Sequence, residues 1–224
     1  MSTDIFAFWE GVPGDARTHP DDKAVLDRAE HGFDTRCLPA SYAGPLRTAR
    51  VVLLYLSPGL AQRDIDEADD AAAHARYLRR REGYAPLDGP DDHREGWQWW
   101  SARTRRFGNW HDLRDKVAFL NISPYHSATF KDYHMLAALP SCRASLSWAQ
   151  SVLFPQANDG ERVVVCLRSA QWWGLGKRGR YGRSLFAPAV GRGGHMLADG
   201  TETAKRDDVV EAVKAVLERE PLSE

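Results

Sequence analysis

The chain has 224 residues, enough for one sizeable α/β domain but too few for two full ones. Its formal net charge of −1 gives no overall electrostatic attraction to nucleic acids or membranes. Its three cysteines are scattered without C-x-x-C spacing, which excludes a disulfide framework and predicts a reduced, cytoplasmic protein. An acid at Asp4 and the lack of an apolar run of about 20 residues argue against a signal peptide and a membrane span.

After an N-terminal arm and helix over residues 1–49, the first predicted core element is a strand over residues 50–56. This apolar run ends in the turn Ser57-Pro58-Gly59, and acidic residues typical of a helix start follow it. In an open α/β sheet, ligands bind at the carboxyl ends of the strands, where backbone N–H groups of a turn and a helix start hold polar groups. We therefore expect this turn to form one wall of a site.

The next three elements are a helix, a loop and a second helix. Residues 64–81 predict a helix, because acids open it and three arginines close it, as the helix dipole favours. Residues 84–96 are rich in Asp, Gly and Pro and predict a loop. Residues 97–107 predict a helix whose three tryptophans lie too close together to face one side. We expect most of them in the core and one at the pocket or the surface.

Two more apolar runs, over residues 116–122 and 162–167, resemble the first and predict parallel strands covered on both faces by helices. A helix is expected over residues 141–154, ending before Pro155, and a weaker fourth strand over residues 184–190. The sequence thus predicts an α/β fold with a mainly parallel, four-stranded sheet.

The last predicted element is an amphipathic helix within residues 199–224, because Val209, Val213 and Val216 fall at helical spacing. Residues 50–198 form the expected core. We interpret the whole chain, residues 1–224, as a single domain.

The second predicted strand ends in Asn121, and a Pro-Tyr-His-Ser turn containing Tyr125 and His126 follows. In a parallel sheet these residues emerge at the same edge as the Ser57 turn, which predicts a joint pocket. The Asn121 amide has the donors and the acceptor to pair with a nucleobase. Taken singly, Asn121 is better read as a turn cap and His126 as an ordinary loop imidazole. Because both residues are expected to meet the Ser57 turn, we weigh a role in ligand binding equally with these structural roles.

Residues 162–198 contain seven lysines and arginines, no Asp or Glu, and interleaved aromatic residues and glycines. Cations hold phosphates and rings stack on bases, so this segment favours a nucleic acid or another polyphosphate ligand. The alternative is a solvated basic loop balanced by acids elsewhere. The cations expected to bind phosphate are Arg168, Lys177, Arg178, Arg180 and Arg183.

Several common functional motifs are missing from the sequence. No Walker A, G-x-G-x-x-G or G-x-S-x-G motif is present, and the eight dispersed histidines lack the spacing of metal ligands, so we expect neither a metal nor a cofactor. His195 lies on a glycine-rich loop after the last predicted strand. If that loop folds over the same sheet edge, His195 would stabilise a leaving group that gains negative charge.

These motifs together resemble the uracil-DNA glycosylase superfamily over about residues 36–198. Leu56-Ser57-Pro58-Gly59-Leu60 is similar to the first motif of the mismatch-specific branch, an Asn-Pro-Gly turn after the first core strand. Phe119-Leu120-Asn121 is similar to the second-strand motif, whose Asn reads the base. Residues 163–170 are similar to a later strand-to-helix segment. His195 lies roughly where the family places its leaving-group histidine, without the usual His-Pro-Ser.

The resemblance implies a three-layer αβα fold and a monomer that binds DNA or single-stranded nucleic acid. It also implies an enzyme that flips a damaged or unusual base out of the stack and hydrolyses its N-glycosidic bond. Ser57 and His195 would be catalytic. Pro58, Gly59, Asn121, Tyr125 and His126 would surround the base.

One departure from the family pattern concerns the water-activating position. The family has Asp or Asn there, whereas Ser57 is a poorer group for orienting water. Two other functions therefore stay open. One is a module that binds nucleic acid or a nucleotide without cutting it, and the other is a small-molecule hydrolase or transferase on the same fold.

Overall fold

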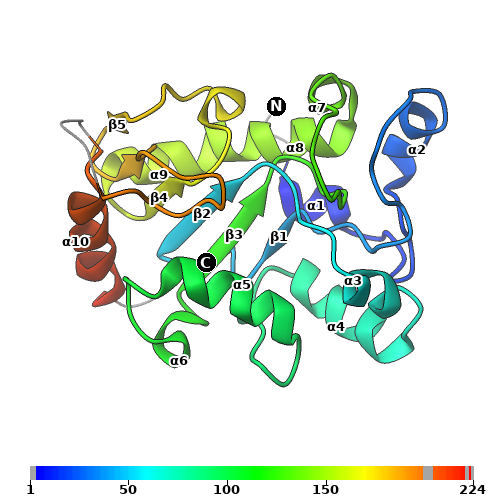
Figure 1. The fold of residues 1–224 in the computed structure, drawn as a ribbon, viewed down its shortest axis with the longest axis horizontal. Coiled ribbons are helices and arrows are strands. Elements are labelled where there is room, and N and C mark those ends of the chain that lie inside the picture. The colour runs from blue at the N-terminus through cyan, green and yellow to red at the C-terminus, as the bar shows by residue number, and fades with distance from the viewer. Residues whose placement is uncertain (1–3, 199–203, 220–221, 223–224) are drawn as a thin grey trace.

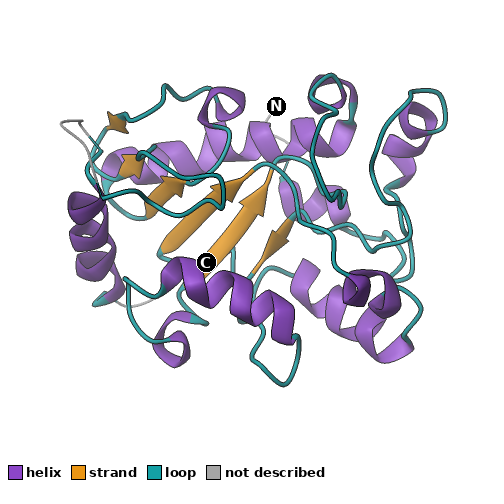
Figure 2. Ribbon diagram, in the orientation of Figure 1, coloured by secondary structure: helices purple, strands orange, loops and turns teal. Residues whose placement is uncertain are grey.

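The computed structural model describes residues 4–198, 204–219 and 222, and a twisted sheet runs through its middle with helices on both sides (Figures 1 and 2). Within these residues the sheet has the strand order β1-β3-β2-β4-β6-β5. The four central strands are parallel, and β1 and β5 add antiparallel pairs at the edges. The strands are β1 (Tyr42–Ala43), β2 (Val51–Tyr55), β3 (Val117–Asn121), β4 (Val163–Cys166), β5 (Arg180–Tyr181) and β6 (Leu185–Phe186).

The predicted α/β class is confirmed, and β2, β3 and β4 form where the three apolar runs predicted strands. The prediction of a mainly parallel, four-stranded sheet was wrong in strand number and direction. The observed sheet has six described strands and is mixed, with both parallel and antiparallel pairs. Strands β1 and β5 have two residues each, too few to show a sequence period. The predicted strand over residues 184–190 shortens to β6, because Pro188 has no N–H to continue the ladder.

The central strands are buried on both faces. In β2, Val52 and Leu54 join one hydrophobic core, whereas Val51, Leu53 and Tyr55 join the other. Helices α1 (Ile5–Trp9), α8 (Pro140–Trp148) and α9 (Phe154–Asp159) cover the first core, and α5 (Arg94–Thr104) and α10 (Arg206–Leu217) cover the second (Figure 1). This burial explains why the strand sequences are apolar throughout rather than alternating.

The longest α-helices of the described residues are α10, with 12 residues, and α4 and α5, with 11 residues each. None of the helices in the described ranges has the length and apolar composition that crossing a membrane requires. The helices are α1 (Ile5–Trp9), α2 (Pro20–Leu26), α3 (Gln62–Glu67), α4 (Ala71–Arg81), α5 (Arg94–Thr104), α6 (Trp110–Leu113), α7 (Met135–Ala138), α8 (Pro140–Trp148), α9 (Phe154–Asp159) and α10 (Arg206–Leu217).

Two helices depart from their predicted bounds. The single helix predicted over residues 64–81 is wrong, because the chain breaks between α3 and α4, where the Asp70 side chain caps a new helix by accepting the Ala72 N–H at 2.9 Å. The predicted end before Pro155 is also wrong. The chain widens into a π-helical turn at Ala149–Leu153, continues as α9, and stops at Gly160 with φ of 77°. The wider turn accommodates a proline that cannot donate an N–H.

The other helices lie close to their predictions. Helix α5 begins at Arg94, three residues before its predicted start, because His93 caps it by accepting the Gly96 N–H on Nδ1 at 2.9 Å. Helix α10 buries Val209, Val213 and Val216, as their spacing predicted. Residues 199–203, which begin the predicted C-terminal segment, lie outside the described residues.

Candidate functional site

A pocket of about 360 Å³ opens at the carboxyl ends of β2 and β3. Five of the seven residues predicted to be catalytic or to surround the base line it, namely Ser57, Pro58, Gly59, Asn121 and His126. The pocket volume lies near the lower end of the range for small-molecule sites. The two turns that the sequence predicted to meet therefore do meet, and they enclose space for a group of modest size.

Asn121 is held in one orientation at the end of β3. Its backbone N–H donates to the Ser41 carbonyl at 2.7 Å, and its side-chain Nδ2 donates to the Ala40 carbonyl at 2.8 Å. Among the described residues, the other amide N–H and the carbonyl oxygen of this side chain have no partner, so both remain for a ligand. This donor and acceptor pair matches the edge of a nucleobase.

Aromatic side chains form the apolar wall of the pocket. Trp99 on α5 is 39% exposed, and its ring centroid lies 5.3 Å from that of Phe119 and 4.8 Å from that of Tyr55. Trp100 also lines the pocket but is buried, with Nε1 donating to the Asp88 carbonyl at 3.0 Å. Trp99 is thus the tryptophan whose exposed indole ring faces the pocket, and this ring can stack on a planar ligand.

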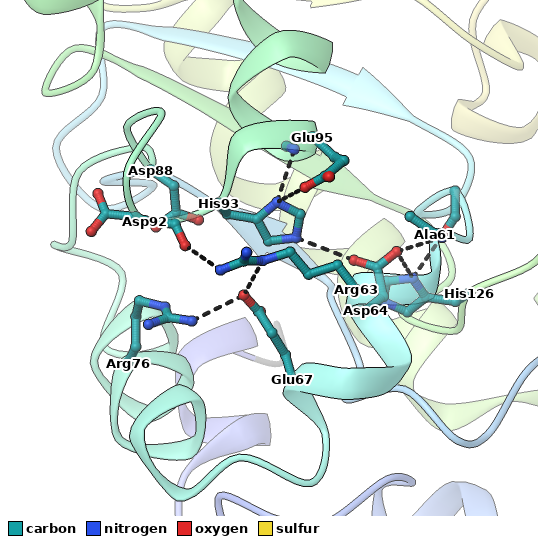
Figure 3. Close-up of polar contacts among 12 residues, drawn as sticks. Ala61, Arg63, Asp64, Glu67, Arg76, Asp88, Asp92, His93, Glu95 and His126 are labelled. Atoms are coloured by element: carbon teal, nitrogen blue, oxygen red, sulfur yellow. Dashed lines mark hydrogen bonds and ion pairs between the residues drawn. The ribbon is translucent and has the colours of Figure 1, made fainter.

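Asp64 on α3 is the charged centre of the pocket (Figure 3), although the sequence suggested only that it opens a helix. Its Oδ1 lies 3.4 Å from His93 Nε2, and its Oδ2 lies 3.5 Å from His126 Nδ1. Oδ2 also accepts the Ala61 N–H at 2.8 Å. Burial by itself raises the pKa of Asp64, but the contacts with His126 and His93 outweigh it and hold this pKa well below its usual range. Asp64 is therefore ionised at neutral pH.

The tautomer of His126 follows from its neighbours. Its Nδ1 lies 2.6 Å from the carbonyl oxygen of Gly59, and a carbonyl only accepts hydrogen bonds. Nδ1 must therefore carry the proton, which leaves Nε2 with a lone pair when the ring is neutral. Nε2 has no hydrogen-bond partner among residues 4–198, 204–219 and 222, so it is the ring nitrogen available to a ligand or water.

His93 lies on the opposite side of Asp64 (Figure 3). Burial lowers the pKa of His93, but nearby carboxylates, Asp64 foremost, outweigh burial and raise it. Protonation places a hydrogen on Nδ1, which breaks the bond from the Gly96 N–H and leaves Glu95 Oε2, at 3.9 Å, as the nearest carboxylate acceptor. Protonation of His93 therefore changes the charge of the pocket and also removes the side-chain cap of α5.

A second set of contacts holds α3 against the loop before α5 (Figure 3). Arg63 donates to the Asp92 carbonyl at 2.8 Å and to Glu67 Oε1 at 3.1 Å, and Arg76 on α4 donates to the same Glu67 oxygen at 3.0 Å. These bonds fix the helix that carries Asp64. The side chain of Asp64 thus has a rigid support.

Tyr125 does not line the pocket, contrary to its predicted place beside the base. Its side chain is 1% exposed, and its hydroxyl donates to Asp22 Oδ2 at 2.6 Å and accepts the His19 N–H at 3.2 Å. The other oxygen of Asp22 accepts the Ser141 N–H at 3.0 Å, in the first turn of α8. Tyr125 therefore helps to hold a buried carboxylate that caps a helix.

His195 also lies outside the pocket. It is exposed on the loop whose Gly193 carbonyl accepts from Arg103 Nη2 at 2.8 Å, and the Arg103 guanidinium stacks on Trp99 at 4.1 Å. Partial burial, together with Arg103 and Arg105, lowers the pKa of His195. His195 thus lies near Arg103 and Arg105, outside the lining that contains Ser57 and Asn121.

The cations predicted to bind phosphate fall into two places. Lys177, Arg178, Arg180 and Arg183 lie on and around β5, three strands from β2 in the sheet, and none of them lines the pocket. Arg168 lies nearer, because it follows β4 and donates to the Arg192 carbonyl on the His195 loop.

Arg162, another cation of the same segment, is buried and has a structural role. It donates to the Leu46 and Arg47 carbonyls at 2.7 and 2.5 Å, and burial lowers its pKa to about 10. Part of the basic character of the sequence therefore lies inside the fold.

The charge of the pocket is negative. Asp64, Asp88 and Glu95 line it, whereas no lysine or arginine is among its lining residues. Arg80 pairs with Asp88 from outside the lining. Within the part of the chain that the structure describes, no three His, Cys, Asp or Glu side chains form a group suited to a metal ion. The pocket thus suits an uncharged ligand, or a reacting group that gains positive charge.

Comparisons of this chain with protein-family models, curated proteins and solved structures gave no match. We therefore infer the function from the pocket and from the chemistry of its side chains.

Proposed function

We propose that the protein is a uracil-DNA glycosylase-like hydrolase, with the three-layer αβα arrangement of that superfamily, that excises a damaged or unusual base from DNA. The observation that carries this proposal is that the Ser57-Pro58-Gly59 turn and Asn121 line one pocket. These are the two motifs in which the chain most resembles the family. In this proposal Asn121 reads the base edge and Trp99 stacks on the base.

The negative charge of the pocket agrees with cleavage of a glycosidic bond. Such cleavage passes through a transition state in which the sugar resembles an oxocarbenium ion. Fixed carboxylates aimed at developing positive charge stabilise that state in a partly buried site. Asp64 is ionised and rigidly held, and so contributes this stabilisation without rearranging during the reaction.

The DNA phosphates would stay outside the pocket, because its carboxylates repel them. The Arg103 guanidinium stacks on Trp99, and both Arg103 and Arg168 lie near the Tyr55 hydroxyl, outside the pocket lining. Cations in this position hold the backbone on either side of an extruded nucleotide, which offsets part of the cost of unstacking the base. The cations around β5 are further candidate phosphate contacts.

A second candidate is a hydrolase that acts on free nucleosides. The lack of a lysine or arginine in the pocket lining favours it, because an uncharged nucleoside needs no cation for binding. A module that binds a base without cutting it is the remaining alternative, favoured by a serine where the family has Asp or Asn.

The test is a cleavage panel on the whole protein. Duplex and single-stranded oligonucleotides containing uracil, hypoxanthine, xanthine or mismatches would be treated to reveal abasic sites, with free nucleosides assayed in parallel. We expect excision of at least one base from DNA, and its loss in Asn121→Ala. Gln98→Ala, which removes an exposed amide on α5 outside the pocket lining, is the matched control. Cleavage of nucleosides alone would favour the second candidate, and binding without cleavage would favour the module.

A further inference from the structure

We propose that His126 is the general base that activates the attacking water, and that Asp64 is the positioning residue that orients its ring. This inference rests on the proposed function. It supplies a water-activating group that Ser57, with its neutral and weakly basic hydroxyl, does not provide.

The geometry fixes both the rotation and the tautomer of His126. Its Nδ1 faces the Gly59 carbonyl at 2.6 Å and Asp64 Oδ2 at 3.5 Å, so both neighbours favour a proton on that nitrogen. The ring lines the pocket, and its Nε2 has no partner in the described ranges. A neutral ring held in this way presents a lone pair to a water in the pocket, beside the Ser57 turn.

Asp64 is less suited to be the base itself. Its Oδ1 faces His93, and its Oδ2 is shared between the Ala61 N–H and His126, so neither oxygen is free of protein donors. A carboxylate that is stabilised in its ionised form by three donors is a weak proton acceptor. Besides stabilising positive charge on the sugar, its negative charge stabilises the imidazolium that proton transfer creates on His126.

The proposed step balances in atoms and charge. His126 Nε2 takes one proton from water while the water oxygen bonds to the sugar C1′ atom. The C1′–N bond breaks, and its electron pair leaves with the base. The imidazolium then returns its proton to the departing base or to solvent, so that the net reaction adds one water across the N-glycosidic bond.

The charged groups around His126 favour this proton transfer. Asp64 faces it from α3, and Asp34 of the N-terminal arm forms an isolated antiparallel bridge with it, donating its N–H to the His126 carbonyl at 2.8 Å. Arg36 bonds the Asp34 carboxylate and partly neutralises it. His93 lies behind Asp64 and competes for its charge when protonated. A pH profile therefore reports on this set of groups, with His126 as the group that must be neutral.

The decisive variant is His126→Asn in the full chain. An asparagine amide can still donate to the Gly59 carbonyl, but it has no counterpart of Nε2. We expect kcat for excision to fall by about 10²- to 10⁴-fold, the usual contribution of a general base, with KM changed less than about threefold. The acid limb of the pH–rate profile should disappear. Asp64→Asn should reduce kcat less, and it should increase the fraction of neutral His126 that carries its proton on Nε2. His111→Asn, at an exposed histidine on α6, is the control and should change nothing.

The outcomes separate the two proposals. Excision by the wild type that persists in His126→Asn, with an unchanged pH profile, overturns the role of His126 and leaves the proposed function intact. No excision by the wild type overturns both. The tautomer provides a readout that needs no activity, because ¹⁵N NMR distinguishes the two neutral forms of histidine. We expect His126 to carry its proton on Nδ1, and a proton on Nε2 would overturn the inference.

Discussion

Oδ2 of Asp64 lies 3.5 Å from Nδ1 of His126, although the two residues follow different strands of the sheet. The turn after β2 leads into α3, which carries Asp64, and the turn after β3 carries His126. Because these strands are parallel neighbours, both turns emerge at the same edge. The contact therefore follows from the topology of the sheet, and it depends on the folded chain.

This contact predicts a pH dependence of stability. The pKa of Asp64 is lower in the folded protein than in the unfolded chain, so Asp64 stabilises the fold above the usual carboxyl pKa near 4. That stabilisation is lost as the pH falls from about 4 through the folded pKa. The free energy of unfolding of the wild type should therefore exceed that of Asp64→Asn at pH 6, and the two should converge in acid. A difference that stays constant with pH would show that Asp64 is not held in its ionised form.

Trp99 is predicted to stack on the extruded base. Replacing it with alanine should weaken binding of the base-containing strand by about 5- to 150-fold, which corresponds to the usual 1–3 kcal/mol for one base stacked on an aromatic ring. Trp172→Ala is a matched control, because Trp172 is 38% exposed, against 39% for Trp99, but stacks on Tyr133 away from the pocket. Equal effects of the two substitutions on affinity would argue against stacking at Trp99.

Arg168 is predicted to contact phosphate more directly than Arg180 does. Both are arginines that donate to backbone carbonyls, but Arg168 reaches the loop beside the pocket, whereas Arg180 lies on the edge strand β5. Arg168→Ala should lower DNA affinity and reduce the slope of log K against log salt by about 1. Arg180→Ala should leave the slope nearly unchanged. The reverse order would place the DNA along β5.

Tyr125 is predicted to affect stability rather than chemistry. Tyr125→Phe leaves the buried Asp22 carboxylate without its hydroxyl donor, at a cost of about 1–3 kcal/mol, or several degrees in Tm for a chain of this length. The kcat for excision, measured well below the new Tm, should stay within about twofold of wild type. A large fall in kcat with an unchanged Tm would indicate that Tyr125 acts in catalysis rather than in stability.

The sheet and the position of the pocket could be predicted because each depends on short stretches of sequence. Strands buried on both faces are continuous apolar segments of the sequence, so the bounds of β2, β3 and β4 were predicted within two residues. Parallel neighbours bring their following turns together, so the meeting of Ser57 and Asn121 could be predicted as well. Two-residue edge strands and a π-helical turn before Pro155 depend on tertiary contacts, and the sequence has no period that signals them.

The charged centre of the site could not be predicted in the same way. Asp64 looks like an ordinary acid in a helix start, and nothing in the local sequence shows that His93 and His126 approach it from two other segments. The only local signal is that Asp64 follows Ala61 by three residues, the spacing of a side chain that caps its own helix. His195 and Tyr125 were misplaced for the same reason, because their surroundings are set by loops and by the N-terminal arm.

The most direct test of the proposed function is to detect the free base that excision releases. Oligonucleotides carrying each candidate base would be incubated with the protein, and the released base would be identified by chromatography and mass. We predict that the wild type releases at least one intact base and leaves an abasic site, and that folded Asn121→Ala does not. Failure of the folded wild-type protein to release any base from any strand would contradict the assignment of the pocket to base excision.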